Sequence, residues 1–343
     1  MTIQENISLK PYNTFGIDAK ARSFAAFKTV AELEDILGRQ PKNESSLILG
    51  GGSNILLTKD FNGLVLKNEI SGIREVREDA QHIYVKAGAG ENWHAFVLKC
   101  IANGWAGVEN LSLIPGNVGA SPMQNIGAYG VEIRSVFYSL EAFHLRDKKL
   151  VSFTANDCGF GYRESVFKNK YRNEFVILNV TYRLNKVPEY NISYGAVEQE
   201  LQKMGVKELS IGAISQAVIN IRSSKLPDPK AIGNAGSFFK NPHVSAERYR
   251  ELKADFPKIV GYLQENGDQK LAAGWLIEHC GPKEGVSWKG FRRGDAGCHN
   301  WQSLVLVNYG EATGKEIYDL SEEILQSVKE KFGVVLEREV NII

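Results

Sequence analysis

The sequence predicts a mixed α+β fold with more than one domain, and three observations lead to this prediction. The chain has 343 residues, which at roughly 150 residues per domain corresponds to about two domains with cores of their own. Apolar residues at helical spacing alternate along the chain with short strand-like runs. The 33 glycines gather in a few segments, which is typical of backbone that lies close to a ligand.

The first 70 residues contain a predicted helix and two short strands around a glycine loop. The helix begins at about Thr29, because Thr29 and Glu32 form the T-x-x-E pattern of a capping box. A strand at 47–49 follows, then the loop GGGSN at 50–54, then another apolar run from Ile55. The predicted order is therefore strand, glycine loop, strand.

The middle of the chain predicts an antiparallel sheet with helices packed against it. A strand at 83–87 leads into a helix with apolar positions at Trp93, Phe96, Val97, Cys100 and Ile101, closed by Gly104. The alternating runs at 136–145 and 175–184 are typical of antiparallel strands with one buried face.

The two prolines of LPDP, at 226–229, mark a predicted domain boundary, and a smaller α/β unit follows them. Helices are predicted near 270–280 and over 313–332. The second begins at the capping pattern of Thr313 and Glu316 and stops at Gly333. The last ten residues, VVLEREVNII, read as a strand.

Composition and charge argue against several classes of protein. The 41 Lys and Arg residues balance 40 Asp and Glu residues, so neither nucleic-acid nor membrane-surface binding is expected. The four cysteines form no CxxC pair, so neither a metal site nor a disulfide framework is expected. The N-terminus has no signal-peptide pattern, and the charge-free stretch 110–131 contains two prolines and four glycines. We therefore expect a cytoplasmic protein.

Two glycine loops suit a pyrophosphate and imply different cofactors. GGGSN offers backbone amides for an anion-binding nest, with Ser53 and Asn54 as further donors, although a tight turn explains this loop equally well. A Rossmann loop leads into a helix, whereas this one leads into a strand. GAGENW at 88–93 does open a helix, but Trp93 stands where a third glycine would allow close packing. A Rossmann dehydrogenase remains the alternative that rests on this second loop.

A third glycine-rich segment favours a bound flat cofactor. Residues 114–130, IPGNVGASPMQNIGAYG, combine small side chains with the neutral donors Gln124 and Asn125 and carry no charge. Such a segment suits close wrapping around a cofactor and its diphosphate. A loop this long and polar is uncommon where there is nothing to bind.

Seven motifs occur in one order along the chain: NTFGIDAKA, LGGGSN, GAGENW, LIPGNVGASPMQNIGAYG, FGYRES, KLPDP and GNAGSFFKNP. Together they resemble the UDP-N-acetylenolpyruvoylglucosamine reductase (MurB) family over essentially the whole chain. The segment ISYG around Tyr194 resembles the corresponding segment in the longer of the family's two types, in which an extra loop contacts the substrate.

The resemblance implies FAD held in the fold shared with vanillyl-alcohol oxidase and p-cresol methylhydroxylase (PCMH). It also implies NADPH as co-substrate and reduction of the enolpyruvyl ether of UDP-N-acetylglucosamine to UDP-N-acetylmuramate, a peptidoglycan precursor. Residues 1–70 and 71–226 would form two α/β FAD-binding subdomains, and 227–332 a smaller substrate-binding domain. Residues 333–343 would form a strand that returns to the FAD-binding part. We expect a monomer that binds no metal, nucleic acid or membrane.

The resemblance assigns FAD binding to the glycine loops and to one arginine. Arg222 matches a residue near the pyrimidine edge of the flavin, where a positive charge stabilises the reduced anionic flavin. The other implied FAD-binding residues are Gly50, Gly51, Gly52, Ser53, Asn54, Pro115, Gly116, Gly119, Ser121, Pro122, Gln124, Asn125, Gly127, Ala128, Tyr129 and Gly130.

Three residues match the family's catalytic positions. Arg163, in FGYRES, would grip the substrate carboxylate with its planar fork and stabilise the charge that hydride addition leaves there. Ser237, in GNAGSFFKNP, would protonate the neighbouring carbon. Glu339, in LEREV, matches the second glutamate of LEPEV and would help near an anion only if it is protonated or paired with a cation. The sequence departs from the family here, since Arg338 replaces a proline and Asn341 an arginine.

Five further residues match substrate-binding positions. Tyr194, Lys225 and Asn241 correspond to residues that grip the uridine diphosphate, and Tyr162 and Gln302 to pocket residues. Two other functions stay open: an FAD-dependent oxidase of the same fold acting on a sugar or lactone, and a non-catalytic flavin or nucleotide-sugar binding protein. An oxidase would have no need of KLPDP and GNAGSFF together.

Overall fold

The computed structural model describes residues 2–41 and 44–343, and the chain separates into two compact units. Unit 1 contains the chain up to Ile7, Ala21–Gly52 and Phe61–Ser224; unit 2 contains Ser8–Lys20, Ser53–Asp60 and Lys225–Ile343. Two short segments that the sequence places in the first subdomain, 8–20 and 53–60, thus group with the C-terminal part. The four-part division expected from the sequence stays a prediction.

The first sheet of unit 1 has the strand order β1-β2-β5-β3 and is built around a parallel pair on each side of β5. Its strands are β1 (Gln4–Ser8), β2 (Lys20–Phe27), β3 (Ser46–Leu49) and β5 (Phe61–Asn68). The helix α1 (Val30–Arg39) joins β2 to β3, and its N-cap Thr29 accepts a hydrogen bond from the Glu32 N–H. This confirms the predicted helix and its start.

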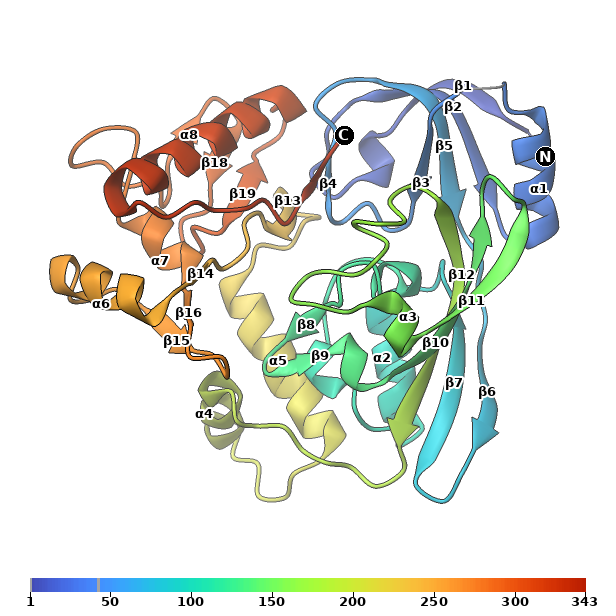
Figure 1. Ribbon diagram of the computed structural model, residues 1–343, viewed down its shortest axis with the longest axis horizontal. Coiled ribbons are helices and arrows are strands. Elements are labelled where there is room, and N and C mark those ends of the chain that lie inside the picture. Colours follow the sequence, from blue (N-terminus) through green and yellow to red (C-terminus); the bar gives the residue numbers. More distant parts are fainter. Residues whose placement is uncertain (1, 42–43) are drawn as a thin grey trace. The chain divides into compact units, whose positions relative to one another are not determined.

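The second sheet of unit 1 is antiparallel, with the strand order β11-β10-β12-β7-β6 (Figure 1). Its strands are β6 (Ile73–Glu78), β7 (His82–Gly88), β10 (Phe137–His144), β11 (Lys149–Thr154) and β12 (Phe175–Asn185). The helices α2 (Trp93–Ala102) and α3 (Ala155–Cys158) belong to the same part, and α2 buries Trp93, Phe96, Val97 and Cys100. The predicted strands, their antiparallel pairing and the helix are confirmed.

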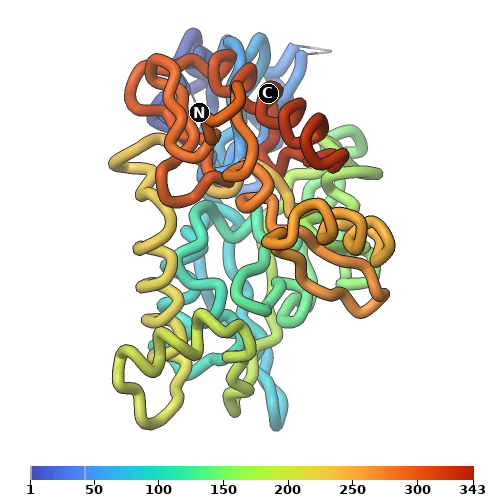
Figure 2. Tube along the Cα trace, turned by 90° about the vertical axis from the view of Figure 1, so that its left-hand side faces the viewer, coloured from blue at the N-terminus to red at the C-terminus, as the bar shows by residue number. Residues whose placement is uncertain are grey.

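Two helices of unit 1 were not predicted: α4 (Gly195–Lys203) and α5 (Ile211–Lys225). Figure 2 shows α5 as an unbroken yellow coil. The apolar pattern of α5 is blurred, because the polar Ser215 is buried while Ile219 lies outside the buried stripe. This helix carries Arg222, so the sequence offered no structural context for that residue.

Unit 2 is built on a four-stranded sheet with the order β13-β19-β18-β17. The strands are β13 (Gly233–Ser237), β17 (Arg292–Arg293), β18 (Ala296–Cys298) and β19 (Val305–Asn308). The helix α8 (Gly314–Phe332) begins at a complete capping box of Thr313 and Glu316 and ends at Gly333, which has a left-handed φ of 63°. Both predicted ends of α8 are confirmed.

Smaller elements complete unit 2 and correct two predictions. A three-stranded sheet contains β14 (His243–Val244), β15 (Gly261–Leu263) and β16 (Gln269–Leu271), accompanied by α6 (Ala246–Asp255) and α7 (Ala273–Glu278). The helix predicted near 270–280 was too long, because Lys270 and Leu271 extend the sheet. The strand predicted over the last ten residues shrinks to β20 (Asn341–Ile342), which pairs in parallel with β4 (Ile55–Leu56).

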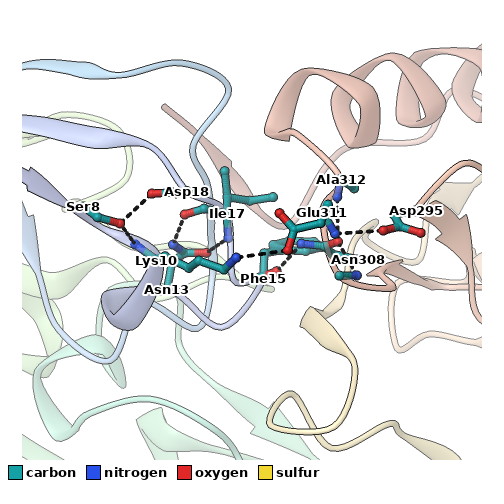
Figure 3. A network of polar contacts seen from close by, with 11 residues as sticks. Ser8, Lys10, Asn13, Phe15, Ile17, Asp18, Asp295, Asn308, Glu311 and Ala312 are labelled. Atoms are coloured by element: carbon teal, nitrogen blue, oxygen red, sulfur yellow. Dashed lines mark hydrogen bonds and ion pairs between the residues drawn. The ribbon is translucent and has the colours of Figure 1, made fainter.

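The NTFG motif has a structural role inside unit 2 (Figure 3). The buried Asn13 donates to the carbonyls of Leu9 and Ile17 at 2.7 and 2.9 Å, and its Oδ1 accepts from the Ile17 N–H at 2.9 Å. Asn308 of β19 donates to the Phe15 carbonyl at 2.9 Å. The motif therefore fixes residues 8–20 to the sheet of unit 2.

Within residues 2–41 and 44–343, no helix has the length and apolar character that crossing a bilayer requires. The same residues contain no group of His, Cys, Asp and Glu side chains placed to hold a metal ion. The four cysteines are buried and free.

Candidate functional site

Three glycine-containing segments of unit 1 touch one another backbone to backbone. A Cβ placed on Gly51 would lie 2.7 Å from Asn117 Oδ1 and 2.8 Å from Gly116 Cα, a distance that no real side chain tolerates. Asn117 Nδ2 in turn donates to the Gly90 carbonyl at 2.6 Å, and the Gly119 N–H donates to the Ala89 carbonyl at 3.0 Å. The three predicted loops therefore form one continuous surface in unit 1.

The chemical character of this surface fits a cofactor with a diphosphate. Residues 50–52 and 114–130 have no charged side chain, and Gly52 and Gly116 have left-handed φ values of 62° and 110°. Left-handed residues within a run of amides turn successive N–H groups to one side, as in anion-binding nests. The residues of unit 1 thus fit FAD, and residues 50–52 and 114–130 are the ones that would hold its diphosphate.

A lysine that the sequence reasoning missed adds a positive charge to the glycine loops. Lys67, near the end of β5, donates from Nζ to the Gly50 carbonyl at 2.6 Å. Burial lowers the pKa of Lys67, and the nearby Glu69 opposes that effect. The available signal was one charged residue directly after the apolar run of 64–66.

Gly51→Ala is expected to leave the purified protein with little bound flavin. The added methyl group collides with the Gly116 backbone, so the two loops must move apart. Gly38→Ala in α1 is the matched control, because a Cβ there meets nothing within 4 Å. The measurement is the ratio of flavin to protein absorbance after purification. Full flavin content in Gly51→Ala would refute the role of this contact.

Arg163 lies in a tight turn that is fastened to the third glycine-rich segment. Gly161 and Glu164 exchange backbone hydrogen bonds at 3.0 and 3.3 Å, and Arg163 between them has a left-handed φ of 56°. Its Nη2 donates to the Gly127 carbonyl in β8 (Gly127–Ala128) at 2.7 Å, and its guanidinium lies 5.3 Å from the Tyr162 ring centre. β9 (Val131–Glu132) pairs with β8. The structure thus brings Arg163, Tyr162 and the 114–130 loop together.

Backbone strain is concentrated in this region. Among the described residues, seven non-glycine residues have a left-handed φ, and four of them are Leu113, Asn125, Tyr129 and Arg163. The left-handed conformation costs an L-residue on the order of 1–2 kcal/mol. Such strain persists only where the surroundings enforce it, and it gathers at functional sites.

Arg222 reaches the same loop from α5. Its Nε donates to the Leu113 carbonyl at 3.2 Å, and its side chain is hydrogen-bonded to Tyr129. Burial lowers the pKa of Arg222, Tyr129 opposes this, and the positive charge of Arg163 lowers the pKa further. Two guanidinium groups therefore act on one region of unit 1, which suits an anionic ligand.

Two predicted FAD-binding side chains already have protein partners. The amide of the buried Asn125 donates to Glu132 and to the Gly161 carbonyl at 3.0 and 2.9 Å, and its oxygen accepts from the Arg134 N–H. The Ser121 hydroxyl shares a 2.7 Å hydrogen bond with Tyr182. Asn125 therefore holds the Arg163 turn in place, and contact of either side chain with FAD stays a prediction.

In unit 2, Ser237 and Glu339 belong to neighbouring segments. Ser237 pairs with Val305 in β19, and the next residue, Phe238, accepts from the Glu339 N–H at 2.8 Å. Asn54 donates to the Glu339 carbonyl at 3.3 Å. The GGGSN loop is thus divided, because its glycines lie in unit 1 while Ser53 and Asn54 belong to unit 2 with Glu339.

The two residues that differ from the family pattern, Arg338 and Asn341, both form hydrogen bonds within unit 2. Arg338 forms an ion pair with Glu322 at 2.7 Å and donates to Ser321 at 2.9 Å, both on α8. Asn341 donates to the Asn54 carbonyl through its backbone N–H at 3.0 Å and its Nδ2 at 2.9 Å. Both residues therefore fix the segment that carries Glu339.

The predicted substrate-binding residues are spread over both units. Asn241 accepts from the Ala273 N–H at 3.0 Å at the start of α7, and Gln302 accepts from the Leu304 N–H at 3.4 Å. Tyr194 is exposed, and its ring meets Tyr129 edge-on with centres 5.4 Å apart. Lys225 is exposed at the end of α5. Their roles toward a substrate stay predictions.

Comparison with known protein families finds two matching models. Residues 21–151 match an FAD binding domain, and residues 228–343 match the C-terminal domain of UDP-N-acetylenolpyruvoylglucosamine reductase. The first match contains all three glycine loops, and the second contains Ser237 and Glu339.

Full-length relatives agree with these matches. The chain is 49% identical over 344 residues to a UDP-N-acetylenolpyruvoylglucosamine reductase of Flavobacterium johnsoniae, with all of both chains covered. It is 50% identical over 344 residues to the reductase of Amoebophilus asiaticus, again with all of both chains covered. Its fold is similar to the crystal structure of the Thermus caldophilus reductase, with a TM-score of 0.67, 22% identity and coverage of 100% and 99% of the two chains.

Proposed function

The chain belongs to the UDP-N-acetylenolpyruvoylglucosamine reductase family, and from this premise we propose that it reduces the enolpyruvyl ether of UDP-N-acetylglucosamine to UDP-N-acetylmuramate, with FAD as cofactor and NADPH as reductant. The observation that carries the proposal is the identity of 49% over the whole chain to such a reductase. The protein would work as a cytoplasmic monomer in the synthesis of a peptidoglycan precursor.

Bound FAD would supply hydride transfer from NADPH to the enolpyruvyl group, which is chemistry that no side chain supplies. Hydride addition places negative charge on a substrate that already carries a carboxylate. We assign Arg163 to that carboxylate, because its position in a strained turn fixed to Gly127 holds the guanidinium in place. One unit charge at 4 Å contributes on the order of 4 kcal/mol at an effective dielectric of 20.

We assign proton delivery to Ser237 in unit 2. Its backbone is held by pairing with Val305, and Gly236 before it has a left-handed φ of 71°, within an irregularity of the β13 pairing between Asn234 and Ser237 that fixes the backbone of Ser237. A positioned proton donor contributes about 10²–10⁴-fold to the rate. Glu339 is assigned to the same step, and Tyr162, Tyr194, Lys225, Asn241 and Gln302 to binding of the uridine diphosphate substrate.

The proposed function is tested by following the flavin absorbance of the purified protein without oxygen. NADPH is expected to bleach it, and UDP-N-acetylglucosamine enolpyruvate is expected to restore it. UDP-N-acetylglucosamine, which lacks the enolpyruvyl ether, is the matched control and should leave the protein bleached. A colourless protein would favour a Rossmann dehydrogenase, and a yellow protein that NADPH does not bleach would favour an oxidase or a binding protein.

A further inference from the structure

Three residues of unit 1, His94, Leu113 and Arg222, form a chain of hydrogen bonds, and no role has been assigned to the first two. His94, in the first turn of α2, accepts a hydrogen bond at Nδ1 from the Leu113 N–H at 3.0 Å. The Leu113 carbonyl accepts from Arg222 Nε at 3.2 Å. Both polar groups of Leu113 are therefore held by side chains, one from α2 and one from α5.

Leu113 is an unusual residue for this position. Its φ of 57° is left-handed, and leucine has no short polar side chain that would stabilise this conformation locally. It comes directly before the segment 114–130, which approaches the other glycine loops. Strain of this kind must be enforced by its surroundings, and the hydrogen bond from Leu113 to His94 is one of the contacts that hold this residue.

The geometry determines the protonation state of His94. An N–H donor faces Nδ1, so Nδ1 carries a lone pair and the ring proton sits on Nε2. Burial lowers the pKa of His94, and the positive charge of Arg222 on α5 lowers it further. At neutral pH the ring is therefore an acceptor toward Leu113, and protonation would place an N–H against an N–H.

We propose that neutral His94 is a positioning residue for Arg222, acting through the left-handed residue Leu113. His94 holds the Leu113 N–H, and this fixes the direction of the Leu113 carbonyl, which orients the guanidinium of Arg222. The inference rests on the proposed function and on the expected position of Arg222 beside the flavin, where its positive charge would stabilise the reduced form. Without the acceptor, Leu113 relaxes out of the left-handed region and its carbonyl turns away from Arg222.

The structure offers a variant that keeps the contact and one that removes it. In His94→Asn the side-chain oxygen takes the place of Nδ1 and accepts from Leu113, but it does not titrate. In His94→Leu the side chain fills the space and offers no acceptor. His144→Asn is the control, since His144 lies on β10 beside Asp147 and Glu174.

The first measurement is the flavin midpoint potential of the holoprotein, taken with mediator dyes and a chemical reductant. We expect His94→Leu to shift the potential to a more negative value, while His94→Asn and His144→Asn stay close to the wild type. Arg222→Gln should shift it in the same direction. Adding His94→Leu to Arg222→Gln should then produce no further shift, because His94 acts through Arg222.

The second measurement is the nitrogen NMR spectrum of the imidazole ring of His94. We expect a neutral ring with the proton on Nε2 at neutral pH and a pKa below the ordinary value of about 6.5. A proton on Nδ1, an unchanged potential in His94→Leu, or additive shifts in the double variant would each overturn the proposal. Failure of NADPH to bleach the protein would instead contradict the proposed function. Both measurements can still be made in that case, because neither of them uses NADPH.

Discussion

Arg163→Lys is expected to slow the substrate-driven return of flavin colour about 100-fold, while bleaching by NADPH proceeds close to the wild-type rate. The guanidinium has five N–H donors in a rigid fork, and one of its nitrogens already donates to the Gly127 carbonyl. Lysine has three donors on a single atom, so it cannot serve that carbonyl and a carboxylate in the same geometry. The loss therefore falls on the half-reaction that develops charge on the substrate.

The rates of the wild type and of Arg163→Lys can be compared directly because both proteins have the same backbone strain at residue 163. Arginine and lysine are both L-residues with a Cβ, so the left-handed φ of 56° costs the same free energy in each protein. Arg134→Lys is the matched control, because Arg134 is another arginine of unit 1 that forms an ion pair with Glu132 and has a side chain 58% exposed. The measurement is stopped-flow flavin absorbance in each half-reaction. An unchanged rate of colour return would remove Arg163 from the mechanism.

Elements with clear end signals were predictable from the sequence. α1 and α8 begin at Thr29 and Thr313, whose side chains accept the backbone N–H groups that the first turn leaves unpaired. By contrast, α5 has a buried serine within its apolar stripe, and the strand β16 reads as the start of a helix. Where tertiary packing decides the conformation, local pattern is a weak guide.

The candidate site was predictable at the level of its motifs and not at the level of its contacts. The three glycine loops were identified, because close approach of backbones requires glycine. That Gly51 meets Gly116 depends on two segments 65 positions apart in the chain, and no local pattern encodes such a contact. The division of GGGSN between the two units also depends on a contact between distant segments. Residues 53–60 belong to unit 2, where β4 pairs with β20.

Lys67 and His94 were missed for a related reason. Lys67 follows an apolar run near the end of β5, and His94 is a single polar residue in the first turn of α2, and both patterns are typical of a surface position. Their significance comes from Gly50 and Leu113, which lie 17 and 19 positions away. The left-handed conformation of Leu113, Tyr129 and Arg163 likewise has no sequence signal, because leucine, tyrosine and arginine are not residues that favour a left-handed φ.

Ser237→Ala is expected to leave bleaching by NADPH intact and to slow the return of colour by about 10²–10⁴-fold. Alanine keeps the backbone pairing of β13 with Val305 and the hydrogen bond from the Phe238 N–H to the Leu304 carbonyl, so the variant should fold. It removes only the hydroxyl. Thermal unfolding that matches the wild type would confirm that the loss is chemical.

Ser237→Cys separates a proton-donor role from a packing role. A thiol is a stronger acid than a hydroxyl, with an ordinary pKa of about 8.5, and it occupies nearly the same place. If Ser237 supplies the proton, the cysteine variant should restore part of the rate that alanine loses, and the rate should fall as the thiol ionises at high pH. If the alanine variant recovers its colour as fast as the wild type, the proton comes from another group, and Glu339, whose backbone N–H binds the residue next to Ser237, would be the first to examine.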